Sequence, residues 1–538
     1  MHIFKLLSTS VISIILVTGC ASLDSKKTPP VTSLPGTQTL AMNEASQAAP
    51  SDTISSETED ESSTAEEASE ETLPDNDWVY SGFIADNDPL KLHAPELLPD
   101  SLEVLRQYNE SREEIGAKLA SISEKKSHPC INITTQDGAR IKSKYEYVAS
   151  VIDVFNCNEE YRLTQRAGVK VRGNSTADQG DEKPYRIKFY EDHNLLGLHD
   201  GREYKSWVLL RAYWNMAPDY TGFSLARYIF GCEYYSSDFT YVNLYINGKY
   251  RGLYLLCEQN QATDGRVELR EPNPRDTGVR FGYLVEIDNY PSDEHPYFNF
   301  DHLNTEITDI SGKSRVMKKR AYSVKSDIYT EGQLEFIRRY ISGCFEILYE
   351  AAEHDRAMMF DDALNVIDAA GTYSEPRDAV EAVIDTKSLA NMLILEELVH
   401  NYDVGEGSFY MAVDFTADSL YPTLTFTAPW DFNWAYEGNA SGSYYACTFQ
   451  PPIGSSDRSN PWFITAMKAD WFGAIVADRW NELRSDDSLY DILDSIMAEC
   501  RTLETDLPSN ESWKIDSAGN ICEFVRGRIS WLDEAWIR

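Results

Sequence analysis

The sequence predicts a mixed α+β protein with a strand-rich N-terminal half and a helix-rich C-terminal half. Residues from about 145 to 290 show alternating apolar positions separated by turn signals, whereas helical spacing dominates within 291–535. Hydrophobic residues make up 42% of the 538 residues and aromatic residues 12%, which suffices for a large buried core and excludes a wholly disordered chain.

Residues 1–20 are expected to be a lipoprotein signal peptide. Lys5 precedes an apolar run, residues 11–17, that is too short to span a bilayer as a helix. The segment ends in Leu16-Val17-Thr18-Gly19-Cys20, which resembles the bacterial lipobox and implies cleavage before Cys20 and acylation of its thiol. An ordinary secretory signal with a chance cysteine is the alternative. The lipoprotein interpretation predicts a lipid-anchored protein on the non-cytoplasmic face of a cell-envelope membrane.

Residues 21–77 are expected to form a disordered tether. They contain 13 acidic and 2 basic residues and almost no aromatic ones, so they cannot bury enough apolar surface to offset the entropy of ordering. The whole chain has a net charge of −38, and the region after the tether is strongly acidic as well. This charge argues against nucleic acid as a partner and predicts that a protein partner is basic.

Eight cysteines remain after Cys20. The pairs Cys130–Cys157 and Cys500–Cys522 are spaced for local disulfides in an exported protein, and a set of buried free thiols is the alternative. The sequence has no Cys-x-x-Cys motif and no Cys/His spacing typical of zinc, so a structural metal site is not expected.

The elements of the strand-rich half follow from alternation and turn chemistry. Residues 78–144 are expected to be an extension that leads into the fold. Tyr185 to Phe189 alternates apolar and basic residues, and Asn247-Gly248 is the strongest hairpin signal in the chain. The expected elements are strands at 167–173 and 185–189, a helix at 220–232, a hairpin over 241–256, and a strand at 281–288 that closes this half.

The helix-rich half begins with an apolar stripe over Glu331 to Glu350. Asp385-Thr386 is a capping signal for a helix that runs to His400. Further helices are expected at 464–484, 488–503 and 520–536.

Several short motifs occur in order along the chain. They are Val169-Lys-Val-Arg-Gly-Asn-Ser-Thr176, Lys183-Pro-Tyr-Arg-Ile-Lys-Phe189, Leu195-Leu-Gly-Leu198, Gly252-Leu-Tyr-Leu-Leu-Cys-Glu258, Gly265-Arg-Val267, Gly282-Tyr-Leu-Val-Glu-Ile-Asp288, Asn401-Tyr-Asp403 and Pro429-Trp-Asp-Phe-Asn433. Each alone is weak, but the ordered set resembles the CotH kinase family over residues 145–535. The resemblance implies an atypical protein-kinase-like fold of two lobes, 145–290 and 291–535. It also implies transfer of the ATP γ-phosphoryl group to protein hydroxyls with Mg²⁺ or Mn²⁺.

Phosphoryl transfer needs a metal held by carboxylates and a carboxylate that orients the attacking hydroxyl. The resemblance implies that Asp403 is this catalytic carboxylate and that Asp431 holds the metal, assisted by Asn433 and Ser408. Without the resemblance, an aspartate in a glycine-containing loop such as that of Asp403 is usually a turn former. Asp431 lies between two aromatic residues, where a buried charge requires a cation or hydrogen bonds.

Phosphoryl transfer also needs cations that bind the phosphates, and the resemblance implies Arg172, Lys183 and Lys188 for this task. Lys188 is expected on the polar face of its strand as a catalytic lysine, and a solvated strand lysine is the alternative. Arg172 begins a tight turn that would direct backbone N–H groups toward phosphate, or is part of an ordinary hairpin turn. Glu258 occupies the position of a hinge that contacts the nucleotide, or is an exposed strand end.

The sequence departs from the family pattern at three points. Ser408 stands where relatives usually have a metal-holding asparagine. In the helix after the Lys188 strand, Thr221-Gly222 replaces the family's Arg-Asn at the start, and no glutamate is suited to pair with that lysine. The alternative function is therefore a weak or inactive pseudokinase that acts as a binding or scaffold lipoprotein at the cell surface. An active enzyme would modify Ser, Thr or Tyr hydroxyls of secreted or surface proteins. The absence of a Gly-x-Ser-x-Gly motif disfavours an esterase.

Overall fold

The computed structural model describes residues 97–173, 177, 183–211, 217–291, 296–452, 458–507 and 513–537. The chain divides between Pro74 and Asp75 into two units, and all described residues belong to the second. The predicted signal peptide with Cys20, the tether, and residues 174–176 of the turn after Arg172 lie outside the described residues.

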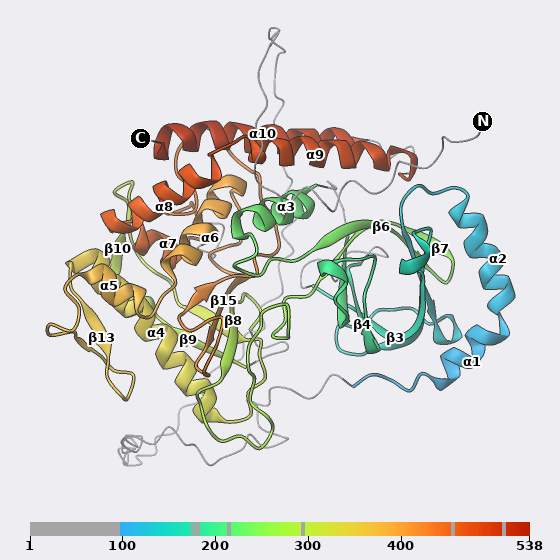
Figure 1. Ribbon diagram of the computed structural model, residues 1–538, viewed down its shortest axis with the longest axis horizontal. Helices are drawn as coiled ribbons and strands as arrows, with labels where there is room; N and C mark the ends of the chain where they lie inside the picture. Colours follow the sequence, from blue (N-terminus) through green and yellow to red (C-terminus); the bar gives the residue numbers. More distant parts are fainter. Residues whose placement is uncertain are drawn as a thin grey trace, which may run out of the picture. The chain divides into compact units, whose positions relative to one another are not determined.

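A closed barrel of seven described strands forms the first part of the fold (Figure 1). In barrel order the strands are β1 (Cys130–Thr135), β2 (Val148–Phe155), β3 (Leu163–Val171), β4 (Tyr185–His193), β5 (Tyr204–Arg211), β7 (Lys249–Glu258) and β6 (Phe239–Ile246). Val169, Ile187 and Trp207 are fully buried inside it. The hairpin predicted around Asn247-Gly248 is confirmed as β6 and β7. The mixed α+β class and the strand-rich first half are therefore confirmed.

The segment before residue 145 is more than an extension. Its strand β1 closes the barrel by pairing in parallel with β6, more than a hundred residues away in sequence. Two helices, α1 (Leu102–Glu110) and α2 (Arg112–Ser123), precede it. Val104 and Tyr108 of α1 pack on Ala149 and Val151 of β2. Residues before 145 therefore supply a barrel strand, whose partner is a distant strand that local patterns do not reveal.

A second sheet has the strand order β16-β15-β8-β12-β9. These strands are β8 (Gly282–Ile287), β9 (Tyr297–Phe300), β12 (Arg320–Val324), β15 (Phe409–Asp414) and β16 (Thr425–Phe426). The strand expected at 281–288 exists as β8, but it does not close the first half, because it pairs with β12 and β15 of this sheet. Two short hairpins accompany the sheet, β10 (Glu306–Thr308) with β11 (Ser314–Val316) and β13 (Met358–Phe360) with β14 (Val366–Asp368).

Helices build most of the remaining structure. They are α3 (Pro218–Phe230), α4 (Glu331–His354), α5 (Pro376–Glu381), α6 (Thr386–Val399), α7 (Pro461–Ala466), α8 (Asp470–Leu483), α9 (Ser488–Thr502) and α10 (Trp513–Trp536). The Asp385 side chain caps α6 as predicted, by accepting from the backbone N–H of Ser388. The single helix expected at 464–484 is divided into α7 and α8, because Ala469 has an extended backbone.

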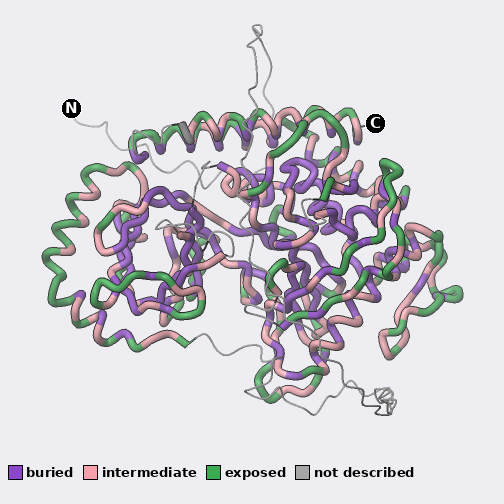
Figure 2. Tube along the Cα trace, turned by 180° about the vertical axis from the view of Figure 1, so that it is seen from behind, coloured by how far each residue is buried: buried purple, intermediate pink, exposed green. Residues whose placement is uncertain are grey.

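The helices, the second sheet and one outer face of the barrel share a continuous hydrophobic core. Val208 and Leu255 on the outer face of the barrel belong to the same cluster as Phe223 of α3 and Leu393 of α6. Figure 2 shows buried residues concentrated in the barrel walls and in this helix–sheet region. The eight described cysteines are all free thiols, so neither Cys130–Cys157 nor Cys500–Cys522 is a disulfide. Among the described residues, no helix combines the length and the hydrophobicity that a membrane span requires.

Asp506 lies shortly after α9, and its side chain links the end of this helix to the barrel. Its carboxylate accepts hydrogen bonds from the backbone N–H of Ser127 at 2.8 Å, from Asn243 of β6 at 3.1 Å, and contacts His128 Nδ1 at 2.6 Å. Burial alone would raise the pKa of Asp506, but these hydrogen bonds, with that of His128 foremost, lower it to about 2.

Asp506→Asn is expected to reduce the free energy of unfolding by about 2–3 kcal/mol at pH 7. Because the folded-state pKa is lowered, this stabilisation is present above the unfolded pKa near 4 and is lost as the pH falls toward 2. Urea denaturation at pH 7 and at low pH measures the difference. Glu504→Gln, at an exposed neighbouring position, should leave stability within about 0.5 kcal/mol of wild type. Equal stability of the Asp506 variant and wild type at pH 7 would contradict this account.

Candidate functional site

Two loops of the helix-rich half meet at one place. One loop follows α6 and contains residues 400–408, and the other follows β16 and contains residues 429–433. The Asn401 side-chain amide donates to the Asp431 carbonyl at 3.3 Å, and the Ser408 hydroxyl donates to Asp431 Oδ2 at 3.5 Å. Asn433 Nδ2 donates to Asp431 Oδ1. The structure thus brings together the three residues expected to hold a metal.

The backbone of both loops is strained at these positions. His400, which ends α6, has a φ of 51°, Ser408 of 57° and Asp431 of 64°. Left-handed conformations of this kind in non-glycine residues cost about 1–3 kcal/mol each and persist only where the surroundings fix them. At Ser408 the backbone N–H donates to Glu286 Oε1 at 3.1 Å, which fixes the strained residue beside Asp431.

Asp431 lies in an environment that disfavours its negative charge. Burial, together with the nearby carboxylates of Asp219, Asp403 and Glu286, raises its pKa to about 7, against the lowering effect of Arg172. A carboxyl held at this value gains from any added positive charge. The site is therefore electrostatically suited to a cation.

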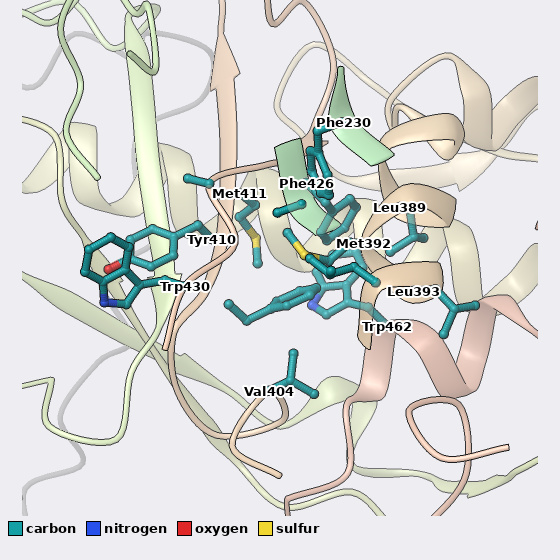
Figure 3. Close-up of a cluster of buried hydrophobic side chains, with 14 of the residues drawn as sticks. Phe230, Leu389, Met392, Leu393, Val404, Tyr410, Met411, Phe426, Trp430 and Trp462 are labelled. Carbon is teal, nitrogen blue, oxygen red and sulfur yellow. The ribbon is translucent and has the colours of Figure 1, made fainter. Parts of the chain in front are cut away.

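Arg172 supplies positive charge from the barrel side. It directly follows β3, and its backbone N–H donates to the carbonyl of Pro184 at 3.1 Å. Its guanidinium carbon lies 5.2 Å from the centre of the Trp430 ring, and its charge lowers the pKa of both Asp219 and Asp431. Figure 3 shows Trp430 beside Tyr410 at one side of the hydrophobic cluster. This predicted phosphate-binding residue thus lies at the same site as Asp431.

Asp219 was not among the residues expected from the sequence. It lies in the first turn of α3, and its Oδ1 accepts the backbone N–H of Phe432 at 2.9 Å. Burial raises its pKa to about 6, against the lowering effects of that hydrogen bond and of Arg172. The Pro218-Asp219 pair is a recognisable helix start, but no local signal links it to a loop more than two hundred residues away.

Gly222 of α3 packs against the same loop. A Cβ at this position would lie 2.2 Å from the Phe432 ring, so α3 approaches the loop closely only because residue 222 is glycine.

Gly222→Ala is expected to displace Phe432, and with it Asp431, and to lower the free energy of unfolding by about 1–3 kcal/mol. The matched control is Gly473→Ala in α8, where a Cβ would meet nothing within 4 Å. That change should instead stabilise the protein by about 0.5–1 kcal/mol, since alanine is the better helix former. Thermal unfolding of both variants measures the contrast, and stabilisation by both would show that the packing at Gly222 is not tight.

Asp403 occupies a tight turn that also faces this site. Its carbonyl accepts the backbone N–H groups of Glu406 and Gly407, each at 2.9 Å, and its own N–H donates to Asn401 Oδ1 at 3.2 Å. Its carboxylate forms an ion pair with Arg458. Burial raises the pKa of Asp403, Arg458 lowers it, and Glu406 raises it.

A buried ion cluster behind Ser408 also went unrecognised in the sequence. Lys325 Nζ lies 2.9 Å from both Glu286 Oε2 and Asp288 Oδ2. Burial opposes the charge of Lys325, but the two carboxylates raise its pKa overall. Both acids belong to the Val-Glu-Ile-Asp stretch that carried part of the family resemblance, which was the available signal. Because Glu286 and Asp288 are far from Ser408 in sequence, their position behind this residue could not be predicted.

The remaining predicted residues lie elsewhere on the barrel. Lys188 is on the outer side of β4, between Gly168 of β3 and Ser206 of β5. Lys183 donates to the carbonyl of Ala177. Their assignments as phosphate-binding or catalytic residues stay predictions.

Glu258 at the end of β7 is fully buried and is not an exposed strand end. Its carboxylate accepts from Arg266 Nε at 3.0 Å and from the backbone N–H of Asp238 at 2.9 Å, and contacts His199 Nδ1 at 2.8 Å. Burial raises its pKa, but His199 and Arg266 lower it overall. A contact of this carboxylate with nucleotide stays a prediction.

The donor atoms around Asp431 fit a magnesium ion in kind. Carboxylate, amide and hydroxyl oxygens of Asp431, Asn433 and Ser408 are hard ligands of the type that Mg²⁺ prefers. Within the described ranges, no group of three or more His, Cys, Asp or Glu side chains is arranged to hold a metal ion. Mg²⁺ in phosphate chemistry is usually bound by one or two carboxylates together with substrate phosphates and water.

A comparison with protein-family models matches residues 169–532 to the family described as CotH kinase protein. The chain belongs to the CotH kinase family. The matched region begins in β3 and ends in α10, so it contains Arg172, Asp219, Asp403 and Asp431 but not β1 or β2. A search of curated proteins finds no match. Membership of this family indicates an atypical kinase-like protein.

Proposed function

We propose that this CotH kinase family member is an atypical protein kinase that transfers the γ-phosphoryl group of ATP to Ser, Thr or Tyr hydroxyls. The observation that carries the proposal is the meeting of Asp403, Asp431, Ser408 and Asn433 in one site with Arg172. The barrel and the helix-rich half would correspond to the two lobes of a kinase-like fold.

The side chains have distinct tasks in this proposal. Asp403 orients the acceptor hydroxyl and accepts its proton, and Arg172 binds phosphate oxygens with its guanidinium and nearby backbone N–H groups. Asp431, Asn433 and Ser408 would hold Mg²⁺ or Mn²⁺, which when bound neutralises phosphate charge. The raised pKa of Asp431 supports this role, because a cation is the compensation that its burial lacks.

The proposed setting is the cell envelope. The Gly19-Cys20 ending of the signal-like segment supports an acylated anchor on the non-cytoplasmic face, and the acidic residues after it support a tether. The net charge of −38 supports a basic secreted or surface protein as substrate. Mass spectrometry of the mature N-terminus tests the anchor, since acylated Cys20 is expected there and an unmodified residue would exclude it.

The experiment that tests the activity follows γ-labelled ATP with the purified chain, Mg²⁺ or Mn²⁺, and a basic acceptor protein. Label is expected in the acceptor or in the chain itself, and is expected to be lost when metal is omitted or Asp403 is replaced by asparagine. No label with either metal would exclude the kinase proposal.

A pseudokinase that binds partners at the cell surface is the second candidate. Ser408 favours it, because the hydroxyl is shorter than an asparagine side chain and lies 3.5 Å from Asp431 Oδ2. For this candidate, nucleotide or metal binding is expected without label transfer, and Ser408→Asn is expected to increase metal affinity. Melting temperature measured with and without nucleotide and metal separates binding from transfer.

A further inference from the structure

The Arg458 side chain contacts the carboxylate of Asp403 and two other residues of the same loop, Glu406 and Tyr402. Its Nη1 pairs with Asp403 Oδ1, and its Nε lies 3.9 Å from Glu406 Oε2. Its guanidinium carbon lies 3.9 Å from the centre of the Tyr402 ring. The Arg458 side chain is 21% exposed and that of Asp403 17%, so the pair is largely withdrawn from water.

The backbone next to Arg458 is fastened to the loop that carries Asp403. The buried Arg320 side chain donates from Nε to the carbonyl of Gly405 at 2.7 Å and from Nη2 to the carbonyl of Ser459 at 3.2 Å. One buried guanidinium therefore joins the residue after Arg458 to the loop that begins at Asp403.

Two further contacts make this attachment rigid. Asn460 Nδ2 donates to the carbonyl of Val404 at 3.0 Å, and Figure 3 shows Val404 directed toward the hydrophobic cluster near Trp462. A Cβ at Gly405 would lie 2.1 Å from the Arg458 carbonyl oxygen, so the glycine permits the close approach of the two segments.

Exposed ion pairs usually contribute little, because ordering two long side chains costs entropy and water screens the charges. Arg458 differs, since its backbone is already fixed and its guanidinium is packed on an aromatic ring. We propose that Arg458 is a positioning residue for Asp403, which fixes the direction of the carboxylate toward the acceptor hydroxyl. The catalytic consequence rests on the proposed kinase function, whereas the fixing of the carboxylate does not.

The charges that face Asp403 determine what removal of Arg458 would do. Arg458 supplies positive charge, whereas Glu406 and Asp431 are acidic and Tyr402 lies against the guanidinium. Without Arg458, the buried Asp403 carboxyl would lose this positive charge and keep the acidic neighbours Glu406 and Asp431. Its pKa would therefore rise above the already raised value. A base with a higher pKa stays protonated to a higher pH.

The kinetic test compares wild type with Arg458→Met and Arg458→Lys in the labelled-ATP assay. Arg458→Met is expected to lower kcat about 100-fold, to move the acid limb of the pH–rate profile to higher pH, and to leave KM for ATP unchanged. Arg458→Lys keeps the charge but not the planar fork, so its profile should lie between the two. Arg356→Met, at an exposed arginine paired with Glu350, is the matched control and should behave as wild type.

A stability test separates this proposal from the kinase proposal. Melting temperatures are measured for Asp403→Asn, Arg458→Met and the double variant of the full chain. If Arg458 fixes Asp403, the double variant loses less than the sum of the single losses, even when wild type transfers no phosphate. Additive losses overturn the proposal, as does an active wild type whose pH–rate profile and kcat are unchanged in Arg458→Met. An inactive wild type alone excludes only the kinase function.

Discussion

Asp431→Asn is expected to abolish phosphate transfer and the stabilisation by nucleotide with metal, while making the ligand-free protein more stable. The Asp431 carboxylate would be the anionic ligand of the proposed metal, and an amide would offer a neutral, weaker donor. Asparagine also tolerates the left-handed backbone at this position, where φ is 64°. A loss of at least about 1,000-fold in transfer rate is expected, since electrostatic stabilisation of the phosphoryl group would be lost.

The gain in stability follows from the raised pKa of Asp431. A carboxyl with a folded-state pKa of about 7 stabilises the protein fully below the unfolded value near 4, and this stabilisation is lost as the pH rises to 7. At pH 8 the ionised Asp431 carboxylate destabilises the folded state, and Asp431→Asn removes this negative charge. The free energy of unfolding without ligand should rise by about 1–2 kcal/mol at pH 8.

Thermal unfolding with and without ATP and Mg²⁺ measures both effects. Asp478→Asn, at an exposed aspartate in α8, is the matched control and should change neither. A ligand-free Asp431→Asn protein that is less stable than wild type at pH 8 would show that the carboxylate is already compensated within the fold. The metal-binding assignment would then lose its physical basis.

Arg528→Met is expected to destabilise the protein by about 3–5 kcal/mol at pH 7. Arg528 of α10 donates to Glu397 Oε2 at 2.9 Å, and both side chains are fully buried. The same guanidinium donates to the carbonyls of Glu397, Ala440 and Ser443. Removing it leaves a buried carboxylate without its cation and three carbonyls without a donor.

Loss of the Arg528–Glu397 pair is also expected to affect the candidate site, because Glu397 lies close to it in the chain. Glu397 lies in the last turn of α6, and its carboxylate also accepts the backbone N–H groups of Tyr445 and Cys447. Since α6 leads directly into the loop with Asp403, activity is expected to fall with stability. The deficit should be smaller at pH 5 than at pH 8, because Glu397, whose pKa is already raised, is then more readily protonated.

Arg526→Met is the matched control for Arg528→Met. It lies two residues away in α10 and pairs with Asp494, a largely exposed residue. A change of no more than about 0.5–1 kcal/mol is expected, as for surface ion pairs in general. Equal losses in the two variants would indicate that the buried pair contributes no more than a surface one.

Local signals in the sequence were sufficient for elements that local chemistry determines. Asn247-Gly248 fixed the β6–β7 hairpin, and Asp385 marked the start of α6. The resemblance identified two loops, with Asp403 and Asp431, that the structure places side by side. These features depend on turn geometry, capping or short motifs, which can be recognised within a few residues.

Features that depend on distant pairing could not be obtained in this way. β1 pairs with β6, which lies more than a hundred residues away in sequence, and β8 belongs to the sheet that contains β15 rather than to the barrel. Asp219 and Arg458 reach the site from other elements, and their own neighbourhoods look like a helix start and a polar loop. Glu286 was visible in a motif, but its contact with the Ser408 backbone required the sheet register.

We propose that Asp431 and its neighbours hold a metal ion together with nucleotide phosphates. The most direct measurement is a crystal structure with Mn²⁺ and a non-hydrolysable ATP analogue, in which anomalous scattering locates the metal. We expect Mn²⁺ within about 2.5 Å of an Asp431 carboxylate oxygen and of analogue phosphate oxygens, with Arg172 contacting the phosphates. Nucleotide bound elsewhere, or Mn²⁺ bound away from Asp431, would contradict the account.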